Sequence, residues 1–205
     1  MKLFISSGTH LFTDTESRID EIDEKLEELD VVFAEAREGN IPITERIQNW
    51  LWNPLILTAL ASWLISLSAL GKVITSDQEI IEQLEDREID SVSVDKPVHQ
   101  IFTEQRRTWG AANWSMIVLP VILVVKSSNS VVIMFSVVLL IVSAIGLLFA
   151  FLAGSNSERN IHMVLKIREF AKEDEIDQAC LIVGEYHKSD IIDFCKQFDN
   201  IEVVN

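Results

Sequence analysis

The feature that most constrains this 205-residue chain is a long block that is almost free of charge. From Gly110 to Gly154, Lys126 is the only charged residue. The uncharged run over 131–153 is long enough, at about 1.5 Å of helix rise per residue, to cross a hydrocarbon core of about 30 Å. A small soluble domain cannot hide that much uncharged helix, so the sequence predicts a membrane-embedded segment.

A second, shorter apolar run precedes this one. Residues 114–125 are apolar, and with 109–113 included they make a second span that carries a helix kink at Pro120. The polar run 126–130 lies between the two spans. The block therefore predicts a transmembrane hairpin that leaves and returns on one side of the membrane. The alternative is a buried hairpin in a protein core.

A third apolar segment, 55–70, is short for a transmembrane helix. Thr58, Ser62 and Ser66 form a small polar stripe along it at helical spacing. Such a stripe fits close helix packing or a helix at the membrane surface. A single crossing here would separate the strands expected on either side of it, so we expect that this segment does not cross, or dips in and returns.

The charge pattern predicts which side the soluble part occupies. Basic residues flank the predicted hairpin at Arg106, Arg107, Arg159, Lys166 and Arg168, against Lys126 alone in its turn. By the positive-inside rule this pattern predicts a multi-pass protein of the cell membrane with a cytoplasmic globular part. The formal charge of −15 argues against nucleic acid as a partner, because phosphates need Lys and Arg.

Outside the apolar block, short apolar runs alternate with helical patterns. Strands are expected at 2–6, 31–34, 89–94, 179–183 and 201–204. Helices are expected after the capping boxes that begin at Thr13, Ser76 and Ser155, the last continuing to about Lys172, and again over 189–198. This alternation predicts an α/β fold with a mostly parallel sheet and flanking helices, interrupted by the hairpin. The expected parts are 1–108 and 155–205 for one α/β domain, with 55–70 as a membrane-associated or core helix, and 109–154 for the hairpin.

Three side chains follow predicted strands where open α/β sheets build their ligand sites. His10 comes shortly after Ile5-Ser6-Ser7-Gly8, and His187 follows Leu181-Ile182-Val183-Gly184. Glu35 directly follows the apolar run 31–34. Two imidazoles and a carboxylate are ligands for Mn, Co or Zn. The plainer alternatives are capping or packing histidines and a salt-bridged glutamate.

Other residues of metal-binding or reactive type carry less information. His99 and His162 fall in predicted helices and are interpreted as structural or exposed. Cys180 and Cys195 fit no metal or redox spacing and are interpreted as buried thiols.

The motifs resemble the TraB/PrgY/Tiki family, which carries a glycine-x-x-His motif near each end of its domain, with a glutamate and an arginine between. Gly184-Glu185-Tyr186-His187 matches the second motif. Glu35 with Arg37, Ser93-Val94-Asp95-Lys96-Pro97, and Glu158-Arg159-Asn160 with Met163 resemble the family's central passages in order. The first motif departs from the pattern, because Gly8-Thr9-His10 has one residue fewer between glycine and histidine.

The resemblance implies an α/β fold related to the erythromycin-esterase-like group, a divalent metal, and metal-dependent peptide hydrolysis. His10 and His187 would ligate the metal, with Glu35 as third ligand or general base. Arg37 or Arg159 would stabilise the developing oxyanion, and Asp95 would orient an imidazole from behind.

We therefore expect a membrane-anchored, metal-dependent hydrolase that acts on a peptide or similar carbonyl substrate. The alternative is a non-catalytic module of the same fold that binds a peptide or partner at the membrane. A transporter is disfavoured, because the hairpin carries no intramembrane acid or base. The expected partners are the lipid bilayer and a peptide, and the sequence leaves a homo-oligomer open.

Overall fold

The computed structural model describes residues 1–8, 15–35, 42–69, 76–172 and 176–204. The chain forms two compact units, each of which is described by itself. The sheet unit comprises Met1–Arg37, Gly71–Lys96 and Asn156–Asn205. The helical unit comprises Glu38–Leu70 and Pro97–Ser155, so it includes the segments 38–70 and 97–108 as well as the apolar block.

The sheet unit is built on five parallel strands. They are β1 (Lys2–Gly8), β2 (Val31–Ala34), β3 (Asp90–Ser93), β4 (Gln178–Gly184) and β5 (Glu202–Val204), in the spatial order β3-β2-β4-β1-β5. Every pairing between neighbouring strands is parallel. The predicted α/β class and parallel sheet are therefore confirmed, and each observed strand lies within two residues of its expected bounds.

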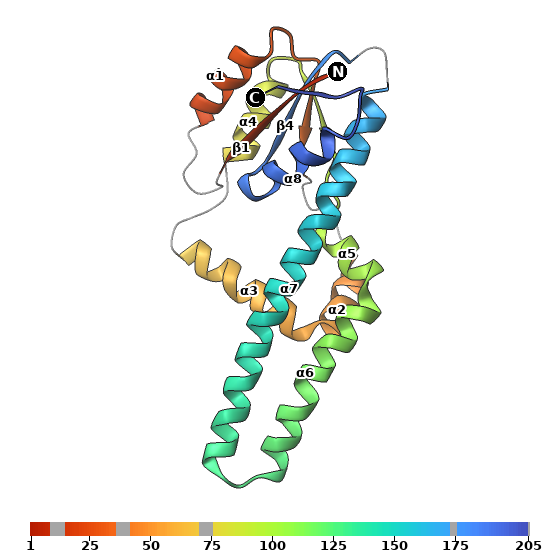
Figure 1. Ribbon diagram of the computed structural model, residues 1–205. Coiled ribbons are helices and arrows are strands. Elements are labelled where there is room, and N and C mark those ends of the chain that lie inside the picture. The colour runs from red at the N-terminus through yellow and green to blue at the C-terminus, as the bar shows by residue number, and fades with distance from the viewer. Residues whose placement is uncertain (9–14, 36–41, 70–75, 173–175, 205) are drawn as a thin grey trace. The chain divides into compact units, whose positions relative to one another are not determined.

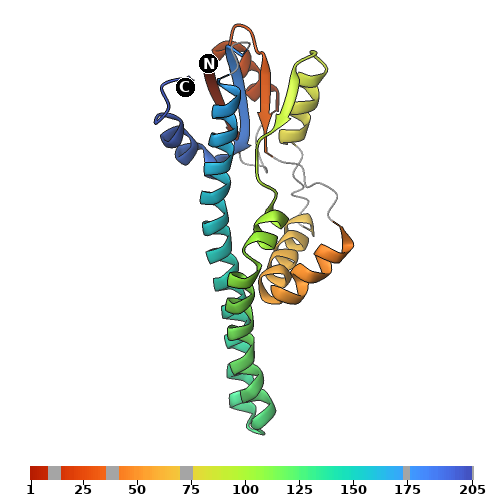
Figure 2. The same ribbon diagram turned by 90° about the vertical axis from the view of Figure 1, so that its right-hand side faces the viewer.

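Helices cover both faces of this sheet. The helices α1 (Thr15–Lys25) and α4 (Ser76–Glu85) pack on one face, while α8 (Glu185–Cys195) and the last part of α7 (Ser130–Phe170) pack on the other (Figures 1 and 2). Alternate strand residues point to opposite faces. Phe4 and Ile182 accordingly lie in the α1/α4 core, and Ile5 and Leu181 lie in the α7/α8 core.

The strand order creates one switch point. The chain leaves β2 toward β3 at one edge of the sheet, and it leaves β4 in the opposite direction toward β5. Because β2 and β4 are neighbours, their two connections diverge between them. In open α/β sheets a crevice at such a point, outside the carboxyl ends of the strands, is the usual place for a ligand.

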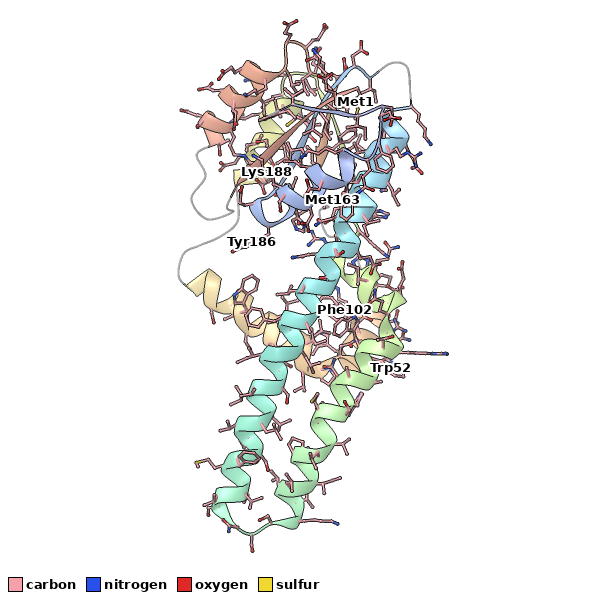
Figure 3. All side chains as sticks on the ribbon, in the orientation of Figure 1. Met1, Trp52, Phe102, Met163, Tyr186 and Lys188 are labelled. Atoms are coloured by element: carbon pink, nitrogen blue, oxygen red, sulfur yellow. The ribbon has the colours of Figure 1, made fainter. Side chains whose placement is uncertain are left out.

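The helical unit consists of α2 (Ile43–Trp52), α3 (Pro54–Ala69), α5 (Val98–Glu104), α6 (Arg106–Lys126) and the first part of α7. A small core joins α3, α5, α6 and α7, with Ile56, Ile101 and Leu148 around a stacked pair of rings, Phe102 and Phe151, whose centroids are 4.1 Å apart. Figure 3 labels Phe102 among these helices. Beyond this core most apolar side chains of α6 and α7 are exposed.

Two helices of this unit are long and apolar enough to cross a membrane. In the most apolar window of α6 only 17% of residues are buried, and in that of α7 only 11%. A core helix of a soluble protein would be mostly buried. A short connection, Ser127–Asn129, joins the two helices, and the Asn129 side chain accepts a hydrogen bond of 2.9 Å from the Val131 amide at the start of α7. The predicted polar turn between two apolar helices is therefore present.

Two predicted helix boundaries are wrong. Ser155 does not cap a new helix, because α7 runs without a break from Ser130 to Phe170 and the Ser155 hydroxyl donates to the Leu152 carbonyl within it. The last helix begins at Glu185 rather than at 189, directly after β4, with Gly184 as its N-cap residue. His187 therefore stands in the first turn of α8.

Candidate functional site

Polar side chains from several elements gather at the carboxyl edge of the sheet. Glu35 follows β2, Asp95 comes two residues after the end of β3, and His187 belongs to the first turn of α8 after β4. Arg159 and Asn160 reach them from α7. Three of the predicted site residues, Glu35, Arg159 and His187, are therefore brought together by the fold.

Glu35 is held at the switch point between β2 and β4. Its amide donates to the Ile182 carbonyl at 3.3 Å, and its Oε2 accepts a hydrogen bond of 3.4 Å from the Gly184 amide. Its side chain is 24% exposed. The carboxylate thus lies at the carboxyl ends of β2 and β4 and is partly open to solvent.

Arg159 joins this carboxylate to Asp95. Its Nε donates to both Asp95 oxygens at 3.0 Å, and its Nη2 donates to Glu35 Oε1 and to Asp95 Oδ2. Burial alone would lower the pKa of this guanidinium, but its hydrogen bonds and charge interactions with Asp95 and Glu35 outweigh burial and raise the pKa above its usual value. Arg159 is therefore cationic at every accessible pH.

Asp95 has little contact with solvent and is the anchor of the ion-pair network. Its side chain is only 2% exposed, and its Oδ1 also accepts a hydrogen bond of 2.6 Å from the Lys96 amide. The neighbouring Lys96 forms an ion pair with Glu158 of α7. The end of β3 is thus tied to α7 by two adjacent ion pairs.

His187 is buried, and its hydrogen bonds define which nitrogen carries the proton. Asn160 Nδ2 donates to the Asp190 carboxylate at 3.1 Å, which turns Asn160 Oδ1 toward His187 Nδ1 at 2.5 Å. An amide oxygen only accepts, so Nδ1 must be the protonated nitrogen. The lone pair is then on Nε2.

Nε2 faces the Glu35 carboxylate. Its distance to Glu35 Oε1 is 4.0 Å. Two ligand atoms that share one ion at about 2.1 Å each lie at most about 4.2 Å apart, so this pair fits a common divalent metal. It fits equally an ion pair in which Nε2 also carries a proton.

Other predicted residues are not tested. His10 and Arg37 lie outside the described residues, so neither can be related to His187 or Glu35. The end of β1, two residues before His10, pairs in register with Gly184. Within the described ranges no three His, Cys, Asp or Glu side chains form a metal-binding group.

One predicted role is corrected, and two residues were missed. The group that orients His187 is Asn160, whereas Asp95 binds Arg159. Asn160 directly follows Arg159, and Asp190 lies one turn after His187, so their sequence positions contained a signal. An amide side chain is not a common metal ligand, and for that reason the sequence alone did not identify Asn160 as the partner of His187.

Two cysteines and Tyr186 take no part in this network. Cys180 and Cys195 are buried free thiols, as predicted. Tyr186, beside His187, is 89% exposed and projects from the start of α8 (Figure 3).

No family model, no curated protein and no solved structure matches this chain.

Proposed function

We propose that the protein is a membrane-anchored, metal-dependent hydrolase whose site lies at the carboxyl edge of β2 and β4. The observation that carries the proposal is His187, a buried imidazole with Nδ1 fixed by Asn160 and Nε2 facing Glu35 at 4.0 Å. This is how metal-binding histidines are oriented in proteins, with a hydrogen-bond acceptor behind the ring.

In this proposal His187 and Glu35 hold a divalent metal, and His10 is the third ligand. A metal of this kind polarises a carbonyl group and lowers the pKa of water. Arg159 positions Glu35 through the ion pair and also pairs with Asp95. Its Nη1, which makes no hydrogen bond within the described residues, is the group that would face the oxyanion of a peptide or similar carbonyl substrate.

The resemblance to the TraB/PrgY/Tiki family remains a proposal as well. It is supported by the fact that Glu35, Arg159 and His187, which lie in the resembling passages, come together in one network. The shortened first motif, Gly8-Thr9-His10, is the point at which the chain departs from that pattern.

The membrane anchor in this proposal is the hairpin of α6 and α7, with the sheet unit in the cytoplasm. Strand pairing supports it. β3 and β4 belong to one sheet, so the segment between them must cross the membrane an even number of times. β2 and β3 are paired too, and therefore α3 cannot cross singly between them.

A second candidate function is supported by the Glu35–Arg159 ion pair. Glu35 Oε1, the oxygen nearest His187 Nε2, also accepts from Arg159. A guanidinium there neutralises the carboxylate and competes with a metal cation. This favours the alternative of a non-catalytic module that binds a peptide or a partner at the membrane.

Metal analysis of the full-length protein in detergent separates these two functions. We expect about one Mn, Co or Zn per chain after equilibration and dialysis, and hydrolysis of a peptide library that requires the metal. In His187→Gln and Glu35→Gln the metal content should fall by more than tenfold. His162→Gln, which changes a histidine of α7 that is not a proposed ligand, is the matched control.

Two outcomes contradict the hydrolase. Equal metal content in wild type, His187→Gln and Glu35→Gln would show that the ion is not held by this site. Stoichiometric metal that is lost in His187→Gln, without any cleavage of the library, would favour the binding module.

A further inference from the structure

The helical unit contains a cavity of about 250 Å³ that the proposed hydrolase does not use. Its walls come from α2, α3 and α5. Its lining combines apolar side chains, Leu57, Leu60 and Phe102, with Arg46, Trp50 and His99. A lining that combines apolar side chains with a guanidinium suits an amphipathic anion.

Two polar groups at this cavity could meet a ligand. His99 Nδ1 is buried without a hydrogen-bond partner, and Arg46 is exposed and makes no hydrogen bond or ion pair with a residue that the structure describes. A buried polar atom without a partner destabilises the fold, so His99 Nδ1 indicates a missing ligand. The guanidinium that lines the same cavity favours an oxyanion as that ligand.

A second guanidinium lies next to the cavity. Arg106 of α6 donates to Asn49 Oδ1 at 3.4 Å, and Asn49 lines the cavity. The helical unit carries four basic and three acidic residues, whereas the rest of this acidic chain is strongly negative. An anion is therefore attracted to this unit and repelled by the other.

The position of α2 indicates that this anion belongs to a lipid. The Trp114 indole donates to the Leu51 carbonyl at 3.2 Å, and Gly110 packs so closely on Trp52 that a Cβ there would clash with the ring. α2 therefore lies beside residues 110–114, where the uncharged stretch of α6 begins. In a membrane-embedded hairpin this is the level of the headgroups.

α2 itself presents an apolar row to the outside. Ile43, Ile47 and Leu51 recur at intervals of four residues, and each is more than half exposed. A short helix with such a row, beside tryptophans, suits the membrane surface.

We infer that this cavity binds the phosphate headgroup of an anionic phospholipid, with Arg46 and His99 on the phosphate and Trp50 beside the glycerol backbone. The inference rests on the membrane placement of the hairpin, but not on the metal site. The phosphate of a free phosphate ester has the same chemistry, so the test has to distinguish the two sources.

The test titrates the full-length protein, in neutral detergent, with phosphatidylglycerol or phosphatidylcholine of identical acyl chains, and measures Kd by native mass spectrometry. We expect phosphatidylglycerol to bind about tenfold more tightly, because both lipids carry the phosphate but the quaternary ammonium of phosphatidylcholine neutralises its headgroup and is repelled by Arg46. Arg46→Gln should weaken phosphatidylglycerol binding about tenfold, and His99→Gln should weaken it less.

Arg107→Gln is the matched control, since Arg107 is an exposed arginine of the same unit that does not line the cavity. It should change the Kd by less than about twofold. An equal loss in Arg107→Gln and Arg46→Gln would show diffuse attraction and overturn the inference. Equal binding of the two lipids would overturn it too, as would glycerol 3-phosphate binding as tightly as phosphatidylglycerol.

Metal content and helical circular dichroism are measured on the same samples. Unchanged helicity in Arg46→Gln is expected, because its exposed side chain makes no hydrogen bond or ion pair within the described residues. If lipid preference is absent while metal content is intact, this inference alone fails. If metal is absent while lipid preference is intact, the hydrolase alone fails.

Discussion

The two units of this chain differ in formal charge and in whether their apolar side chains are buried. The sheet unit carries 29 acidic and 13 basic residues, a formal charge of −16, whereas the helical unit carries three acidic and four basic residues, a charge of +1. The sheet unit hides its apolar strands between two helical layers. The helical unit exposes the apolar faces of α6 and α7.

This difference indicates that the surfaces of the two units suit different surroundings. In the sheet unit, charge keeps the surface in water, and the few buried charges, such as Asp95 and Arg159, are paired with each other. In the helical unit, the large exposed apolar side chains of α6 and α7 are not surrounded by a charged surface. Exposed apolar surface of this extent indicates an interaction with a membrane or another protein.

The largest effect that would break this comparison is expected from charges placed on α7. Val138→Arg with Val142→Arg changes two exposed residues near the middle of the uncharged run. In water such changes are close to neutral, but in a bilayer each costs about 2.5–3.5 kcal/mol, or roughly 5–7 kcal/mol together. We expect the variant to be lost from carbonate-washed membranes.

The control for this variant is Asp20→Arg with Glu24→Arg, two exposed residues of α1. It should fractionate like the wild type. Normal membrane retention of the α7 variant would mean that the exposed apolar surface faces a protein partner instead of lipid.

The next largest effect is expected in the sheet unit. Asp95→Ala removes the carboxylate on which Arg159 depends and leaves the guanidinium partly uncompensated in a buried site. Breaking a buried ion pair in this way costs about 3–5 kcal/mol. The free energy of unfolding, followed by circular dichroism in detergent with denaturant, should fall by that amount.

Asp193→Ala is the matched comparison, because Asp193 pairs with Lys196 at an exposed site. Exposed pairs contribute about 0–1 kcal/mol. If the free energy of unfolding fell equally in both variants, the buried ion-pair network would stabilise the contact between β3 and α7 no more than an exposed pair does.

A smaller effect would show whether the buried polar groups of the sheet unit serve a ligand. Asn160→Leu keeps the size of the side chain but removes the acceptor of His187 Nδ1. We expect metal affinity to fall about 10–100-fold, with ¹⁵N shifts of His187 showing a mixture of ring tautomers. An unchanged tautomer together with unchanged metal affinity would limit Asn160 to packing.

The smallest effect at neutral pH concerns the buried thiols. Burial raises the pKa of Cys180 to about 12 and that of Cys195 to about 11, from an ordinary value of 9.0. Because the folded pKa values are the higher ones, the thiols leave stability unchanged below about pH 9 and reduce it as the pH rises toward 11 and 12. Alkylation by iodoacetamide at pH 8 should therefore be much slower in the native protein than in denaturant. Equal rates would mean that the sheet opens readily.

Much of the fold could be predicted, because its signals are local. Strand runs such as 31–34 and the apolar hairpin depend on periodicity and composition alone. The boundary at Ser155 was wrong because a serine before Asn156-Ser157-Glu158 resembles a cap, yet a helix that is already formed can continue through it. The strand order could not be predicted, because it depends on contacts between segments far apart in the chain.

The candidate site was predicted in part for the same reason. Glu35 and His187 follow strands, and residues at the ends of parallel strands meet at one edge. What the sequence did not reveal is that Arg159 would bind Glu35 and Asp95 together, since that depends on how α7 packs on the sheet. The role of Asn160 likewise depends on a hydrogen bond between α7 and α8.

The strand order also dictates when the sheet can form during synthesis. Among the described residues β1 pairs with β4 and β5, and β4 begins at Gln178. β1 therefore has no partner in this sheet until the hairpin and all of α7 have been made. An N-terminal fragment that ends before Gln178 should hold β1 without a neighbour, and its exposed apolar edge would call for a chaperone or a membrane nearby until the central strand arrives.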